Sequence, residues 1–418
     1  MRRTIERHLG ERVLAALGHA RVVGVIGPRQ GGKSTLAQLI VEVTRDARYV
    51  TLDNLSVRTE AERDPHGFVA DRPGLLVIDE VQRVPELLLA IKAEVDRDDR
   101  PGRFLITGSS QLSANKGVTE TLAGRIVRFE LWPMSQGELA GTREQFVDAV
   151  FQDGPAPEGG SDLVKRDYLR RATAGGYPEA LRLDGVHRDD WFDSYVETVV
   201  EREAPAISAS PRTAELPRLV RLVAARHGGL LNVADLARDA ALPERTVYRY
   251  LETLEAVFLV RRVPAWTANL SSRETRAAKI YLTDPGLAAH LRGVDLETLA
   301  TPELALGADG PVIEGFVVCE LLRQSSWSRS RPSLMHYRER NGSEIDIIVE
   351  NRRRQLVGIE VKSAADVSGR DVRPLTQLRD RIGDRFVAGI ILYCGSEMLR
   401  LGDRIRGLPI SSLWTPAE

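Results

Sequence analysis

The chain has 418 residues, 43% of them hydrophobic and 28% charged, which is enough for about two or three domains with buried cores. Its 58 lysines and arginines balance 59 aspartates and glutamates at a net charge of -1, so nucleic-acid binding would require local basic patches. Two distant cysteines, Cys319 and Cys394, exclude a disulfide-stapled fold and a cysteine-based zinc cluster. No apolar run approaches the roughly 18 residues of a membrane helix, and residues 1–7 lack a signal-peptide core, which predicts a cytoplasmic protein without a membrane partner.

Short β-branched segments alternate with helical segments over the first 150 residues. We expect strands at 22–26, 49–52, 75–78, 104–107 and 126–131, a rhythm typical of βαβ units with a parallel sheet. Stretches rich in proline, glycine or small residues predict joints at 152–160, 204–211 and 301–311. The sequence therefore predicts the α/β class, with a parallel-sheet core at 1–150, a helical segment at 161–205, a mainly helical domain at 212–300 and an α/β domain at 305–418.

The first expected strand runs into a glycine-rich loop that is followed by a helix at 36–43. The loop consists of Gly27, Pro28, Arg29, Gln30, Gly31, Gly32, Lys33, Ser34 and Thr35, and it matches the phosphate-binding pattern G-x-x-x-x-G-K-[ST]. In such a loop, backbone N–H groups and the helix N-terminus bind phosphate oxygens. Lys33 is predicted to reach the β- and γ-phosphates and Ser34 to supply an oxygen to Mg²⁺. The loop predicts ATP and Mg²⁺ as ligands, because the flanking strand and helix argue against a chance glycine-rich turn.

Two later strands end in residues that suit the same site. The strand at 75–78 leads into Asp79 and Glu80, and the strand at 104–107 ends at Thr107. Because the carboxyl ends of parallel strands line the ligand crevice, Asp79 is predicted near the metal and Glu80 at the attacking water. Thr107 is our choice for sensing the γ-phosphate or positioning water, with turn capping by Ser109 or Ser110 as the alternative for this stretch.

These residues resemble those of AAA-type ATPases of the additional-strand, catalytic-glutamate division. More closely, the chain resembles bacterial and archaeal predicted ATPases that join such a core to a C-terminal domain of unknown function. The resemblance is carried by the stretches 27–35, 78–82, 107–110, 122–125 and 175–179. It implies an AAA-type core at 1–150, followed by a helical lid at 161–205. It also makes Arg125 a candidate for stabilising transition-state charge, in the same chain or in a neighbouring subunit, with a solvated arginine at the strand entry as the alternative.

The middle of the chain predicts a winged helix. Three helices are expected at 219–226, 233–240 and 244–258, followed by segments at 259–264 and 279–282 that could pair as a wing. Apolar residues of the third helix recur at helical spacing, so Arg245 and Arg249 are predicted to point outward. Such a helix-turn-helix predicts DNA contact through these two arginines, but the same fold also serves as a packing or coupling module.

The tail carries a second set of spaced acids: Glu314 on an expected helix, Asp346 on a strand, and Glu360 with Lys362 on the next strand. Side chains alternate along a strand, so Glu360 and Lys362 share one face. If the two strands pair, Asp346 and Glu360 could hold Mg²⁺ beside a lysine, the arrangement that phosphodiester hydrolysis needs.

This spacing resembles the PD-(D/E)XK superfamily of the restriction-endonuclease-like fold, although Glu344 and Ile345 stand before Asp346 in place of the opening proline-aspartate pair. The resemblance implies a nuclease-like domain at 305–418 in which Glu314, Asp346 and Glu360 bind metal and Lys362 is catalytic, with Gln377 as an accessory polar residue. A solvated Glu/Lys pair is the plainer alternative.

Three functional hypotheses follow. The first is a Mg²⁺-dependent ATP hydrolase coupled to a DNA-linked winged helix and to a nuclease-like tail, with metal-dependent DNA cleavage as its uncertain part. The second is a nucleotide-dependent switch whose tail is catalytically silent and recruits a protein or DNA partner. The third is a nucleotide-regulated transcription factor that uses only the helix-turn-helix. The sequence leaves the oligomeric state open, including a homo-oligomer.

Overall fold

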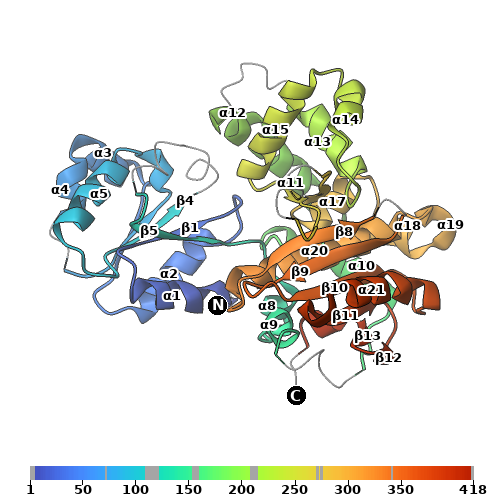
Figure 1. Ribbon diagram of the computed structural model, residues 1–418. Helices are drawn as coiled ribbons and strands as arrows, with labels where there is room; N and C mark the ends of the chain where they lie inside the picture. The colour runs from blue at the N-terminus through green and yellow to red at the C-terminus, as the bar shows by residue number, and fades with distance from the viewer. Residues whose placement is uncertain are drawn as a thin grey trace. The chain divides into compact units, whose positions relative to one another are not determined.

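The structure is a computed structural model that describes residues 5–70, 73–108, 122–152, 160–207, 215–269, 273, 276–339 and 342–415. The chain divides into two compact units, coloured along the sequence in Figure 1. The first unit comprises Met1–Pro133, Tyr195–Thr213 and Arg249–Leu259, and the second comprises Met134–Ser194, Ala214–Tyr248 and Val260–Glu418. The finer four-domain division expected from the sequence stays a prediction.

The first unit is built on a five-stranded parallel sheet with the order β2-β3-β4-β1-β5. Its strands are β1 (Val22–Ile26), β2 (Arg48–Thr51), β3 (Leu76–Asp79), β4 (Phe104–Gly108) and β5 (Ile126–Glu130). The five strands predicted from the sequence are confirmed to within one residue at each end. The helices are α1 (Leu9–Leu17), α2 (Lys33–Val43), α3 (Leu55–Arg63), α4 (Pro65–Val69) and α5 (Leu87–Arg97).

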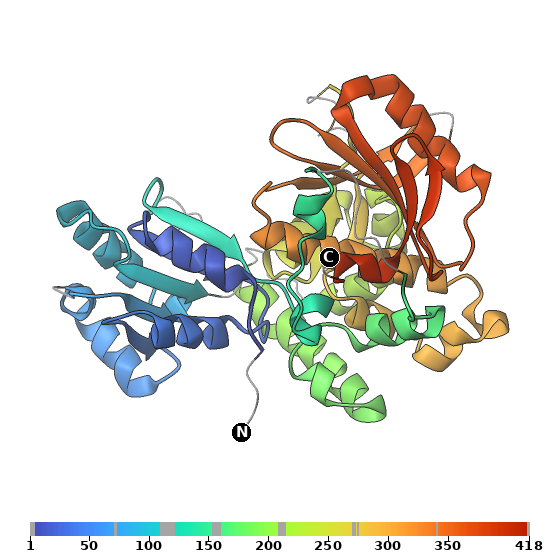
Figure 2. The same cartoon turned by 90° about the horizontal axis from the view of Figure 1, so that it is seen from below.

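Helices cover both faces of this sheet, as Figure 2 shows. Alternate strand residues such as Val22, Ile78 and Ile106 pack in one cluster with Phe68 of α4 and Ile91 of α5. The helices α1 and α2 contact the strands as well. A parallel sheet that is buried on both faces needs nearly continuous apolar strands, which explains why β1, β3 and β4 are buried at every position.

Strand register brings the functional segments to one edge of the sheet. Val25 pairs with Thr107 and Ile26 with Gly108, while Ile78 pairs with Ile106. The loop after β1, Asp79 at the end of β3 and Thr107 near the end of β4 therefore share the carboxyl edge. Ala204–Ile207, at the start of the joint expected at 204–211, forms the helix α12 directly after the π-helix Val199–Glu203, since a proline is tolerated in a first helical turn, and the joint itself stays a prediction. Residues 208–211 of that joint and most of the joint at 152–160 lie outside the described residues.

The middle of the chain contains the helices and the hairpin expected of it. The helices are α13 (Leu216–Ala225), α14 (Val233–Ala240) and α15 (Glu244–Ala256), and β6 (Val260–Val263) pairs antiparallel with β7 (Lys279–Leu282). The neighbouring helices are α8 (Gln136–Ala140), α9 (Phe146–Ala149), α10 (Lys165–Ala174), α11 (Gly185–Thr198), α17 (Pro285–Leu291), α18 (Leu296–Ala300) and α19 (Pro302–Ala305). The last of these lies inside the joint expected at 301–311, so that stretch is partly helical.

The tail forms a six-stranded mixed sheet with the order β12-β13-β11-β10-β9-β8. Its elements are α20 (Asp309–Trp327), β8 (Ser333–Arg338), β9 (Glu344–Glu350), β10 (Leu356–Lys362), α21 (Gly369–Ile382), β11 (Phe386–Tyr393), β12 (Leu399–Gly402) and β13 (Ile405–Pro409). Phe316 of α20 packs in a cluster with Ile347 and Ile359, whereas Leu375 of α21 packs in another with Ile345 and Leu356. The two helices therefore cover opposite faces of the sheet.

A buried ion network lies within the second unit. Arg323 of α20 pairs with Glu320 on the same helix and with Asp284 at 3.3 Å, and all three side chains are at most 1% exposed. Asp284 also accepts a hydrogen bond from the backbone N–H of Gly176 at 2.7 Å. A Cβ on Gly176 would lie 2.8 Å from the Arg323 guanidinium, so only glycine fits here. Gly175 and Gly176 of the stretch 175–179 are therefore explained by packing against this network. Among the described residues, no helix is both long enough and apolar enough to cross a bilayer.

Candidate nucleotide site and the acidic cluster of the tail

The loop after β1 has the backbone of a phosphate-binding loop. Gly32 has φ 97°, in the left-handed region that favours glycine, and it directly precedes the first turn of α2. A Cβ on Gly27 would lie 2.1 Å from the carbonyl oxygen of Leu131. Arg7 braces the loop by donating to the carbonyl oxygens of Gly31 at 2.7 Å and Trp132 at 2.6 Å. The amino end of α2 thus lies in a fixed, tightly packed loop with its free N–H groups available to an anion.

Lys33 is buried in the first turn of α2. Its ammonium group donates to the loop carbonyl oxygens of Gly27 at 3.1 Å and Pro28 at 2.8 Å. Burial lowers the pKa of Lys33, and the nearby carboxylates of Glu80 and Glu203 act in the opposite direction. The side chain lies directly over the loop, the position from which a lysine can reach phosphate oxygens.

Asp79 is the centre of the polar contacts beside the loop. One of its carboxylate oxygens accepts from Ser34 Oγ at 3.1 Å and from the hydroxyl of Thr107, and the other accepts from the Tyr49 hydroxyl at 2.8 Å. Burial, and after it the contact with Asp79, raises the pKa of Tyr49 above its ordinary value. A carboxylate and a hydroxyl in direct contact are hard oxygen donors of the kind that Mg²⁺ prefers. Ser34 and Asp79 therefore fit a magnesium ion bound together with nucleotide phosphates.

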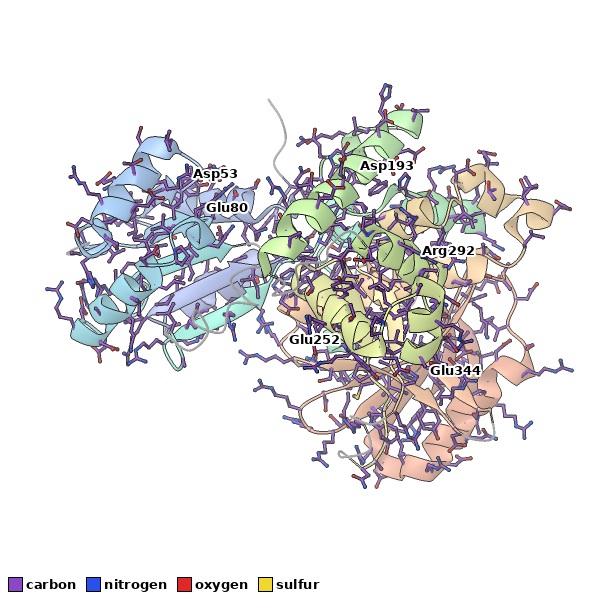
Figure 3. The ribbon with its side chains drawn as sticks, turned by 90° about the horizontal axis from the view of Figure 1, so that it is seen from above. Asp53, Glu80, Asp193, Glu252, Arg292 and Glu344 are labelled. Carbon is purple, nitrogen blue, oxygen red and sulfur yellow. The ribbon has the colours of Figure 1, made fainter. Side chains whose placement is uncertain are left out.

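Glu80 follows Asp79 with φ 58°, a left-handed backbone conformation that is uncommon for a residue with a side chain. Its backbone N–H donates to Thr107 Oγ1 at 3.2 Å, and its carboxylate accepts from the Gln82 amide. Burial raises the pKa of Glu80 above its ordinary value, and Lys33 partly opposes this. Figure 3 shows Glu80 near Asp53 at one edge of the first unit. A strained backbone that fixes a half-buried carboxylate beside a phosphate loop is typical of a functional residue.

Arg125 does not meet these residues. It precedes β5, whose first residue Ile126 pairs with Val22, so it lies at the amino edge of the sheet, opposite the loop. Its guanidinium binds both carboxylate oxygens of Asp96, at 2.5 and 2.9 Å. A role for Arg125 within its own chain is thus disfavoured, and a role toward a neighbouring subunit stays a prediction. Ser109 and Ser110 lie outside the described residues.

Arg245 and Arg249 lie one turn apart on α15, and both are exposed, as the sequence predicts. Tyr248, between them in the sequence, is 48% exposed. An exposed helix face with two arginines and a tyrosine is compatible with contact to a nucleic-acid backbone. DNA contact itself stays a prediction.

The acids of the tail come together only in part. The strands of Asp346 and Glu360 form the expected antiparallel hairpin, with Ile347 opposite Ile359, and Asp346 accepts from the Val361 N–H at 3.0 Å. Glu314 and Asp346 meet at the ammonium group of Lys279, at 2.9 and 3.0 Å, so they bind a lysine where metal binding was predicted. Within the described ranges, no group of three or more His, Cys, Asp or Glu side chains is arranged to hold a metal ion.

Glu360 and Lys362 form an ion pair, but not the solvated pair of the plainer alternative, because Glu360 is buried and its strand β10 lies between β11 and β9 in the sheet. Lys362 Nζ donates to Glu360 at 2.9 Å and lies 3.2 Å from Asp371. Burial, together with the Asp346 carboxylate, raises the pKa of Glu360 to about 8. Gln377 accepts from Ser343 Oγ at 3.0 Å. The catalytic role of Lys362 stays a prediction.

Several residues of these sites were not predicted from the sequence. Arg7 and Tyr49 contact the phosphate loop and Asp79 from positions outside the loop motif. Lys279 and Tyr281, which bind Glu314, lie in a strand that was expected only as part of a wing. The alternation of Lys279 and Tyr281 along one strand face is the one sequence signal that could have pointed to them.

Three family models match successive parts of the chain. Residues 19–140 match the family described as an AAA domain. Residues 165–298 match a domain of unknown function (DUF8612), and residues 309–413 match another domain of unknown function (DUF4143).

The chain is similar in sequence to two relatives and in part to several solved structures. Uncharacterized proteins of Mycobacterium bovis and Mycobacterium tuberculosis are each 29% identical over 411 residues, which cover 98% of this chain and 84% of the relative. AMPPCP-bound DnaA from Aquifex aeolicus is 15% identical over 59% of this chain and 85% of its own, with a TM-score of 0.27. A RuvB variant from Thermotoga maritima is 19% identical over 61% of this chain and 89% of its own, also at 0.27. Residues 19–140, which carry the phosphate loop and the parallel sheet, thus form an AAA-type P-loop ATPase domain, and residues 309–413 form a C-terminal domain of unknown function.

Proposed function

We propose that this protein hydrolyses ATP with Mg²⁺ at the loop formed by residues 27–35. The observation that supports the proposal most strongly is the carboxylate of Asp79, which accepts from both Ser34 and Thr107 at the mouth of the loop. This contact joins the phosphate loop to the ends of β3 and β4. ATP hydrolysis needs a metal ligand and a group that positions water at these two strand ends. Glu80 is the next residue, and Thr107 accepts a hydrogen bond from its backbone N–H.

The residues divide the chemistry among them. The loop N–H groups and Lys33 bind the phosphates, and Lys33 stabilises the negative charge that develops on the transferred phosphoryl group. Ser34 and Asp79 would hold Mg²⁺, which neutralises phosphate charge when it is bound. Glu80 orients the attacking water and accepts its proton, a role for which a pKa above the ordinary value of a glutamate is an advantage. Thr107 holds both acids in register.

Replacing Lys33 with Ala is expected to abolish ATP turnover, because no other cation in the loop can reach the phosphates from the first turn of α2. Phosphate release at saturating Mg²⁺ and ATP measures the effect, and circular dichroism checks the fold. Lys92→Ala, on the helix α5 of the same unit, is the matched control and should retain wild-type turnover. Normal turnover in a folded Lys33→Ala protein would refute the site.

A second candidate function is a nucleotide-dependent switch whose tail does not cleave DNA. The specific observation that favours it is the Lys279 ammonium between Glu314 and Asp346, where metal-dependent cleavage would need a divalent cation. Such a switch would recruit a partner, either a protein or DNA bound through Arg245, Arg249 and the tail.

The switch predicts that linear, single-stranded and branched DNA stay intact with Mg²⁺ or Mn²⁺, in the presence or absence of ATP. A gel-based cleavage assay on the wild type and on Lys362→Ala measures this. Cleavage by the wild type that disappears in Lys362→Ala would instead identify an ATP-linked nuclease.

A further inference from the structure

Lys279 is the most deeply buried cation of the hairpin formed by β6 and β7. Its residue is 3% exposed, and its ammonium group lies 2.9 Å from Glu314 Oε1, 3.0 Å from Glu344 Oε1 and 3.0 Å from Asp346 Oδ1. The three acids come from α20 and β9, so this lysine connects its own strand β7 to both of these elements. Glu344 is labelled in Figure 3.

The backbone holds Lys279 firmly in this position. It pairs with Val263 across the hairpin, and an isolated β-bridge joins it to Leu230 on its other side. Tyr281 lies two residues further along the same strand face, and its hydroxyl donates to Glu314 Oε1 at 2.5 Å. Two neighbouring side chains of β7 therefore both bind the acid of α20.

The same oxygens cannot serve a divalent cation at the same time. Magnesium is bound at about 2.0–2.1 Å by oxygen ligands, and an ammonium group about 3 Å from those oxygens would repel it. The second oxygen of Asp346 already accepts from the Val361 N–H. Oε1 of Glu360 accepts from Lys362, while its Oε2 is buried and makes no hydrogen bond among the described residues. The acids of the tail thus do not fit a metal ion in this arrangement.

We propose that Lys279 takes the place of the metal ion in the nuclease-like tail. Through this lysine, the acids Glu314, Glu344 and Asp346 bind the β6/β7 hairpin to α20 and β9. The acid cluster then stabilises the contact between the hairpin and the tail sheet. The proposal concerns residues of the second unit alone, so it stands or falls independently of ATP hydrolysis at the loop.

The first test measures Mn²⁺ binding to the full-length, nucleotide-free wild type and to Asp346→Asn by electron paramagnetic resonance. Because the ammonium group occupies the cluster, both proteins should deplete the signal of free Mn²⁺ equally at millimolar concentration. Binding by the wild type that is lost in Asp346→Asn would overturn the proposal, and this result does not depend on a variant of Lys279.

The second test removes the ammonium group with Lys279→Met. The carboxylates of Glu314 and Asp346 then lose their cation, and Glu344 keeps only the guanidinium of Arg338 at 3.5 Å, so the melting temperature should fall by about 10 °C or more. The variant should also gain a Mn²⁺ site that raises this temperature and that the further change Asp346→Asn removes. Lys165→Met, which breaks one half-exposed ion pair with Asp309, is the matched control and should shift the temperature little.

Neutralising two of the acids tests whether Lys279 stabilises the protein as their counter-ion. Adding Glu314→Gln and Asp346→Asn to Lys279→Met should recover most of the lost melting temperature, because the two carboxylates left without a cation are then neutral. A Lys279→Met protein that melts like the wild type, or one that gains no Mn²⁺ site, would contradict the assignment of Lys279 as the internal cation.

Discussion

Replacing Glu80 with Gln is expected to lower ATP turnover by about 10²–10⁴-fold while ATP binding stays close to that of the wild type. Glutamine keeps the size and one oxygen of the side chain, but it cannot accept a proton from water. In the proposed site the loop and Lys33 bind the phosphates, and this change replaces neither of them. The expected result is therefore a protein that holds ATP without hydrolysing it, measured by phosphate release together with equilibrium binding of a fluorescent ATP analogue.

The control for this variant is Glu86→Gln. Glu86 is exposed and directly precedes α5 in the same unit. This control should leave both turnover and binding unchanged. If Glu80→Gln retained wild-type turnover, the water-positioning role would have to move to another residue. If it lost binding as well as turnover, the strained backbone at Glu80 would be needed to shape the loop edge.

Replacing Arg323 with Met is expected to lower the free energy of unfolding by about 3–5 kcal/mol. The guanidinium is the counter-ion of both Asp284 and Glu320, which are fully buried, and Met leaves their two charges uncompensated. Burial raises the pKa of Glu320, and Arg323 opposes this shift, as expected for a carboxylate that depends on its buried counter-ion. Urea denaturation followed by tryptophan fluorescence measures the loss.

The exposed Arg329 lies beyond the end of α20, and Arg329→Met should change the free energy of unfolding by less than about 0.5 kcal/mol. A triple variant that adds Asp284→Asn and Glu320→Gln to Arg323→Met should regain part of the stability, since it removes the stranded charges. Equal stability of wild type and Arg323→Met would mean that the buried network contributes nothing to the fold.

The sequence was most informative where local patterns decide the structure. Strands such as β1 and β4 are runs of apolar residues bounded by turn residues, and their ends agree with prediction because a strand buried on both faces permits few alternatives. The placement of Asp79 and Thr107 beside the loop followed from one rule, that parallel strands share a carboxyl edge. Both side chains lie there in the structure.

The residues that the sequence did not reveal act over long distances. Arg7 binds the carbonyl oxygen of Trp132, and Lys279 binds Asp346, so neither partner belongs to a short motif. The spacing of Glu314, Asp346 and Glu360 predicted a metal site, but spacing along the chain does not show which cation enters a cluster of acids. The structure places a lysine from another strand there. Tertiary packing determines this position, and no local sequence pattern indicates it.

The most direct test of the ATPase assignment is the rate of phosphate release by the wild type with Mg²⁺ and ATP, compared with the same reaction in EDTA and with Lys33→Ala. We expect turnover that requires Mg²⁺ and disappears in the variant while the fold is retained. Turnover that is equal in Lys33→Ala, or that persists in EDTA, would contradict it.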